Sequence, residues 1–202
     1  MKHRTFAIGA FQKLPGLNYA HERPFRNWQD NHLTAAIGGW VKQNPPSLEL
    51  ATLALEELRG RGADLNAAMR FAEAGLEPIP WLAAAGQRVR DVFTPEILER
   101  DKSGRLGGAV YVVLRGGYTD TNGHYGAYVG STRKSPAARI TEHRKGVRAG
   151  RGLPRYGIEP LWSLFDAINP VPSRKQELVT WETRLHEALA PVVPKVTGDV
   201  AF

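Results

Sequence analysis

The amino-acid sequence predicts an α+β protein in which an all-helical N-terminal region precedes a small three-stranded antiparallel sheet flanked by helices. Two observations support this fold class. Apolar residues recur at helical spacing through the first half of the chain, and after the polar, glycine-rich residues 101–108 short runs of branched and aromatic residues take over. We therefore expect a helical region at residues 1–104 and a sheet-containing domain at residues 105–202.

The helical region is expected to contain five helices. They are predicted at residues 26–43, 48–58, 64–74, 81–93 and 95–100. Pro45 would end the first helix, because proline cannot continue one. Asp64 can cap the third helix, and Gly75 can close it in a left-handed conformation. The tryptophans expected to anchor the core are Trp28, Trp40 and Trp81.

A glycine-bearing turn at residues 59–63 joins the second and third of these helices. The arrangement weakly resembles a DNA-binding helix-turn-helix, but glycine-linked helix pairs are commoner as packing units, and we favour that interpretation. The sequence assigns no function to residues 1–104, and docking of a protein partner there stays open.

The second half is expected to alternate strands and helices. Strands are predicted at residues 109–114, 125–131 and 160–168, and helices at residues 135–146 and 174–190. The first two strands would pair antiparallel, because the residues between them are polar and rich in turn formers. Ser135 is a suitable helix cap, Pro136 suits the first turn, and Gly146 can close the helix.

Composition narrows the class of protein. The chain of 202 residues is 42% hydrophobic and 23% charged, as in globular proteins, with no apolar run of membrane-spanning length. The apolar patch at residues 6–11 is too short for a secretory signal. The absence of cysteine excludes disulfides, cysteine nucleophiles and zinc sites built on thiolates. We expect a cytoplasmic protein with no membrane partner.

The net charge of +7 is concentrated in the second half. Residues 1–104 carry 13 basic and 12 acidic side chains, whereas residues 105–202 carry 14 and 8. One segment has a single acidic residue and eight basic ones: Arg133, Lys134, Arg139, Arg144, Lys145, Arg148, Arg151 and Arg155. It would attract DNA or RNA, because neutralised phosphates release counterions. The alternative is a solvated basic loop that aids solubility.

Glu182 lies in an unusual place on the final predicted helix. Helical spacing puts it on the apolar stripe formed by Leu178, Leu185 and Leu189, rather than opposite it. A carboxylate there is costly unless a cation or a hydrogen-bond donor meets it. Glu182 is therefore a candidate metal ligand, and the alternative is an internal salt bridge to an arginine.

The order of these elements resembles the GIY-YIG endonuclease family over residues 107–192. The matching features are Tyr111 in the first strand, Tyr128-Val129-Gly130 in the second, Arg139 and His143 on the next helix, a third strand, and Glu182 nine residues before Pro191. Ala109 stands where the family usually has glycine, and the asparagine that often follows the family's glutamate and proline has no counterpart. The resemblance implies an endonuclease that hydrolyses phosphodiester bonds in DNA with Mg or Mn.

The resemblance also implies a role for each residue. Glu182 would bind the metal, and the permanent charge of Arg139 would stabilise the phosphate. Tyr111 would help to activate water, with Tyr128 and His143 orienting it; otherwise these are ordinary strand tyrosines and a surface histidine. The residues expected to bind the nucleic-acid backbone are Arg133, Lys134, Arg144, Lys145, Arg148, Arg151 and Arg155.

Two other functions stay open at this point. One is a nucleic-acid-binding module that has kept the fold and lost the cutting, which the missing asparagine makes possible. The other is a nuclease effector or toxin whose helical half docks a protein partner. RNA also stays open as the substrate.

Overall fold

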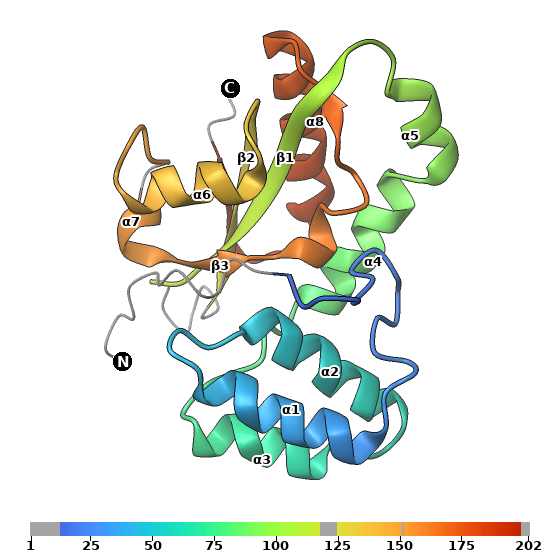
Figure 1. Cartoon of the computed structure of the whole chain (residues 1–202), viewed down its shortest axis with the longest axis vertical. Helices are drawn as coiled ribbons and strands as arrows, with labels where there is room; N and C mark the ends of the chain where they lie inside the picture. The colour runs from blue at the N-terminus through green and yellow to red at the C-terminus, as the bar shows by residue number, and fades with distance from the viewer. Residues whose placement is uncertain (1–12, 118–124, 151, 199–202) are drawn as a thin grey trace.

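The computed structural model describes residues 13–117, 125–150 and 152–198, and its fold is α+β (Figure 1). The helices of the N-terminal half are α1 (Asp30–Lys42), α2 (Leu48–Gly60), α3 (Leu65–Glu73), α4 (Leu82–Val92) and α5 (Pro95–Asp101). The five helices expected there are thus confirmed, with ends that differ by a few residues. In the described part of the chain, no helix has both the length and the apolar character needed to cross a membrane.

Local chemistry explains where these helices begin and end. Helix α1 starts later than expected because Arg61 binds the preceding turn: its guanidinium donates to the carbonyl oxygens of Phe25 at 3.2 Å and Trp28 at 2.7 Å. Asp64 forms no side-chain cap at α3, contrary to expectation, and instead pairs with Arg59 at 3.5 Å. Gly75 does adopt the expected left-handed conformation, with φ of 62°.

Two of the three tryptophans expected to anchor the helical half are buried. Trp40 and Trp81 are 8% and 5% exposed, whereas Trp28 is 37% exposed and packs edge-on against Phe25 at the rim. The indole N–H of Trp81 donates to the carbonyl oxygen of Tyr125 at 3.1 Å, which links the two halves of the chain. Phe93, after α4, stacks on Trp181 with ring centroids 5.9 Å apart. One buried apolar cluster therefore extends from the helical half into the sheet half.

In the described part of the chain the sheet has five strands and is mixed, in contrast to the three-stranded antiparallel sheet that we expected. Its strands are β1 (Leu106–Arg115), β2 (Gly126–Thr132), β3 (Gly157–Pro160), β4 (Val171–Pro172) and β5 (Val196–Gly198). Their order is β3-β1-β2-β5, with β4 also pairing with β1. Strand β5 runs parallel to β2, and the other pairs are antiparallel. The ten residues of β1 leave room for both β3 and β4 along one edge.

The third strand predicted at residues 160–168 is wrong in position. The strand ends at Pro160, and the following apolar residues form the 3₁₀ helix η3 (Trp162–Leu164). The backbone N–H of Ser163 donates to the buried carboxylate of Glu49 at 2.7 Å rather than to a neighbouring strand. Because these residues are buried on a turn, their apolar run resembles that of a strand. The four-residue helix α7 (Leu153–Tyr156) precedes β3.

Two helices cover opposite faces of the β1–β2 pair (Figure 1). Helix α6 (Pro136–Arg144) begins as expected, with the Ser135 hydroxyl accepting from the N–H of Ala138 at 3.3 Å. The second is α8 (Lys175–Leu189). Tyr111 pairs with Gly130 in the register and contacts α6, whereas Ser131, the next residue of β2, contacts α8. This follows from the alternation of side chains along a strand.

Candidate active site

A pocket of about 350 Å³ opens at the edge of the sheet beside β2. The residues that line it are Tyr111, Tyr128, Ser131, Arg133, Arg139, Lys175, Leu178, Val179 and Glu182. Four of the five residues proposed from sequence as catalytic are among them, and they come from β1, β2, α6 and α8. The fifth, His143, lies against Tyr111. The structure therefore brings all five together.

The sheet geometry explains why the pocket lies at this edge. Strand β5 pairs with β2 from Ala127 to Val129, and in the described chain no strand continues this pairing to Ser131. Gly130, at the point where the pairing stops, has no side chain. A Cβ atom there would lie 2.4 Å from the hydroxyl oxygen of Tyr111. Glycine at this position thus lets the phenol of Tyr111 lie across β2 and reach the pocket.

His143 is held between Tyr111 and the backbone. The hydroxyl oxygen of Tyr111 lies 2.6 Å from Nε2 of His143, and the N–H of Gly150 donates to Nδ1 at 3.1 Å. A ring nitrogen that accepts from an amide carries no proton, so the proton of the imidazole is on Nε2 and is donated to the phenolic oxygen. In this arrangement His143 orients Tyr111 and does not accept its proton.

Tyr128 completes a cluster of three buried rings. Its ring centroid lies 6.3 Å from that of Tyr111 and 5.7 Å from that of His143. All three side chains are at most 2% exposed. The ring of Tyr128 rests on Gly150, where a Cβ atom would approach it to 2.5 Å. Close packing leaves these rings little freedom, which fixes the two hydroxyl groups relative to the pocket.

Arg139 presents a fixed positive charge to the pocket. Its guanidinium donates to the carbonyl oxygen of Arg148 at 2.8 Å and to the carboxylate of Glu142 at 3.2 Å. Burial disfavours the charged form, but Tyr111 and Glu142 outweigh that effect and raise the pKa of Arg139 above its ordinary value. The guanidinium is therefore charged at every physiological pH and lies beside the phenol of Tyr111.

Glu182 enters the pocket from the opposite face of the sheet. Its side chain is 7% exposed and accepts a hydrogen bond from the hydroxyl of Ser131 at 2.6 Å. The apolar stripe that was predicted around it is buried: Leu178, Leu185 and Leu189. The carboxylate of Glu182 therefore enters the pocket from the buried, apolar face of α8 and not from the solvent-exposed face.

The oxygen ligands of the pocket suit a divalent metal ion that is bound jointly by the protein and by a substrate. Of the described residues that line the pocket, Glu182 is the only acidic one, and the described chain contains no group of three His, Cys, Asp or Glu side chains placed to hold a metal. Mg²⁺ is usually held by one or two carboxylates together with waters and substrate phosphates. Glu182, with the oxygen of Ser131 next to it, fits this mode rather than an all-protein cage.

The residues proposed from sequence for nucleic-acid binding are spread more widely. Arg133 lines the pocket, and Lys134 forms an ion pair with Glu142. The guanidinium of Arg155 lies over the ring of Tyr156, 5.1 Å from its centroid. The others around the end of α6 are half-buried or exposed: Arg144, Lys145 and Arg148. Arg151 lies outside the described residues.

Sequence reasoning missed Ser131 and Lys175 as members of the site. Lys175, Val179 and Glu182 are spaced by four and three residues, which places them on one face of α8. Once Glu182 was assigned to the site, this spacing could have identified Lys175. Ser131 could have been found from the alternation of β2, but only with knowledge of which face α8 covers.

No protein-family model, curated protein or solved structure matches this chain. The likeness to GIY-YIG endonucleases therefore depends on the order of the residues in the sequence.

Proposed function

We propose that this protein is a divalent-metal-dependent endonuclease of the GIY-YIG type that hydrolyses phosphodiester bonds in DNA. The observation that carries the proposal is the meeting of Tyr111, Arg139 and Glu182, from three separate elements, in one pocket. A phenol, a guanidinium and a carboxylate could each be structural alone. Together at a sheet edge they supply a base, an anion site and a metal ligand.

Tyr111 is the group that we assign to the activation of water. Its oxygen accepts a hydrogen bond from Nε2 of His143 and lies beside the charged guanidinium of Arg139. The neighbouring charge of Arg139 and this hydrogen bond both stabilise a phenolate. A phenolate at this position can accept a proton from an attacking water, while Tyr128 packs against the ring and fixes its orientation.

Arg139 and Glu182 act on the phosphate from the two sides of the pocket. The guanidinium offers donors that match phosphate oxygens and stabilises the charge that develops at phosphorus. Glu182 would hold Mg or Mn with the help of Ser131, and when bound the ion supplies charge stabilisation and assistance to the leaving oxygen. The basic residues around the pocket would contact neighbouring phosphates, which positions DNA without reading its sequence.

Conversion of supercoiled plasmid to nicked and linear forms in the presence of Mg tests this proposal. We expect Tyr111→Phe, Arg139→Gln and Glu182→Gln each to lower the rate by about 10²-fold or more. Glu187→Gln is the matched control, because Glu187 is exposed on the same helix as Glu182. Equal nicking by all four variants and the unaltered chain would remove the assignment.

The same assay separates the proposal from its main alternative. A nucleic-acid-binding module without catalysis would bind DNA in a salt-dependent manner and give no metal-dependent product, and its binding would survive Glu182→Gln. A parallel assay with single-stranded RNA would show whether DNA is the preferred substrate. The helical half contributes none of the described lining of the pocket, so a role in docking a protein partner is compatible with either result.

A further inference from the structure

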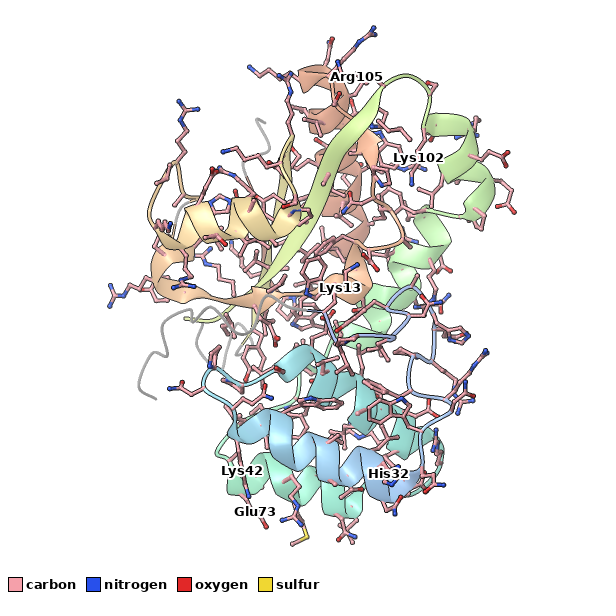
Figure 2. The ribbon with its side chains drawn as sticks, in the orientation of Figure 1. Lys13, His32, Lys42, Glu73, Lys102 and Arg105 are labelled. Atoms are coloured by element: carbon pink, nitrogen blue, oxygen red, sulfur yellow. The ribbon has the colours of Figure 1, made fainter. Side chains whose placement is uncertain are left out.

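A second pocket, of about 570 Å³, lies next to the candidate active site. It is lined by Arg105, Leu106, Gly107, Arg133, Ser173 and Arg174. Arg133 lines both pockets, so the two are adjacent on the surface. Figure 2 shows Arg105 at the start of β1, at the end of the molecule opposite His32, Lys42 and Glu73.

The backbone frame of this pocket is tied together by hydrogen bonds. Ser173, which lies between β4 and α8, donates its N–H and its hydroxyl to the carbonyl oxygen of Arg105, both at 3.2 Å. The carbonyl oxygen of Ser173 in turn accepts from Nε of Arg133 at 2.9 Å. The start of β1, the end of β2 and the start of α8 are thus joined at one point. Three arginines that flank β1, β2 and α8 therefore surround one pocket.

The charges of this pocket are not neutralised within the described chain. Among the described residues, no carboxylate lies within ion-pair distance of Arg105, Arg133 or Arg174. In the helical half, by contrast, many arginines are paired: Arg23 with Glu57, Arg59 with Glu56, Arg61 with Asp30, and Arg70 with Glu73. Three arginines with exposed guanidinium groups and no acidic partner form a site that favours an anion of more than one charge.

We propose that this second pocket binds a phosphate of the DNA backbone next to the phosphate that is cut. The inference rests on the proposed function, and it specifies the path of the substrate. The strand would run from the catalytic pocket toward the start of β1 and of α8, past Arg133. It would not depend mainly on Lys134, which precedes α6 and whose ammonium group is paired with the carboxylate of Glu142.

The test measures DNA binding by the full chain without divalent metal, so that no cleavage occurs. The probe is a fluorescent 20-base-pair duplex, and the variant is Arg105→Gln with Arg174→Gln. The matched control is Arg26→Gln with Arg88→Gln, which removes the same charge from exposed arginines of the helical half. Thermal unfolding of each variant confirms that it is folded.

We expect the Arg105/Arg174 variant to bind about tenfold or more weakly at 0.1 M salt, and its log Kd to depend less steeply on log salt, by about two contacts. The control should bind within about twofold of the unaltered chain. Equal weakening in both variants, an unchanged salt slope, or no binding of the duplex by the unaltered chain would overturn the proposal. A chain that binds DNA through this pocket but never cuts it would contradict the proposed function alone.

Discussion

Glu49 and Glu159 are joined across the boundary between the helical half and the sheet half. The backbone N–H of Glu49, in the first turn of α2, donates to Oε1 of Glu159 at 2.8 Å. The carboxylate of Glu49 in turn accepts from the N–H of Ser163 at 2.7 Å and from its hydroxyl at 2.8 Å. Each glutamate thus caps the start of a helix in the opposite half. Both are at most 3% exposed, so two carboxyl groups are buried side by side.

This pair predicts a contribution to stability that falls as the pH rises. Burial raises the pKa of Glu49 to about 7 against the opposing effect of the bonds from Ser163, and Asp166 adds to it. The pKa of Glu159 is raised well above its usual value, by burial and then by Glu49. The folded state therefore holds more protons on this pair than the unfolded state does, so the contribution of the pair to stability is complete below about pH 4.5 and declines as the pH rises through about 7. For Glu49 alone the loss is about 3 kcal/mol.

Thermal unfolding between pH 4.5 and 8 measures this effect. We expect the decline in Tm to be smaller in Glu49→Gln and in Glu159→Gln, because glutamine cannot ionise. Glu99→Gln is the control, because Glu99 is exposed and lies outside this pair. A pH profile that is the same in all four proteins would show that the carboxyl pair does not titrate as the geometry implies.

The close approach of Tyr111 to Gly130 predicts a severe effect of one added methyl group. In Gly130→Ala the Cβ atom would lie 2.4 Å from the hydroxyl oxygen of Tyr111 and 2.5 Å from Cζ, so the buried ring must move. We expect a loss of stability of about 1–3 kcal/mol and a large loss of DNA cleavage. Gly39→Ala, in α1 with no atom near the added carbon, should be neutral or slightly stabilising. Full activity in Gly130→Ala would place Tyr111 outside the reaction.

The helices of the N-terminal half could be predicted because helical spacing of apolar residues is a local signal. The third strand was misplaced because residues 161–165 are equally apolar in a strand or in a buried turn. The turn is favoured by the hydrogen bond from Ser163 to Glu49, which lies more than 100 residues earlier in the sequence. Strand β5 was missed because its three residues form a strand only through pairing with β2.

For the candidate site, the sequence was informative where a residue broke a local pattern. Glu182 interrupts an apolar helix face, and the structure buries it beside the pocket. Ser131 and Lys175 break no pattern, because a serine at a strand end and a lysine at a helix start are common on any surface. Their place in the site depends on which helix covers which face of the β1–β2 pair, and this is determined by tertiary packing and not by the local sequence.

Among the described residues that line the pocket only Glu182 carries a carboxylate, which predicts that metal binding depends on the substrate. Without DNA, millimolar Mg should change the Tm by less than about 2 °C, because a weakly held ion stabilises little. DNA and Mg together should stabilise more than the sum of the two alone, and Glu182→Gln should remove that excess. Calorimetric unfolding with each component measures it. A large stabilisation by Mg alone would point to a preformed cage that the described residues do not contain.

The contacts of His143 predict its tautomer, and with it the direction of proton donation in the site. Because Gly150 donates to Nδ1, the proton should reside on Nε2, which long-range ¹H–¹⁵N correlation spectra of the labelled chain distinguish directly. We expect an unprotonated Nδ1 and a protonated Nε2 near pH 7. His143→Gln, whose amide can donate to Tyr111, should keep more cleavage activity than His143→Ala, with both variants folded. A proton on Nδ1, or equal activity of the two variants, would mean that Tyr111 donates to His143, so that the imidazole rather than the phenol would be the base.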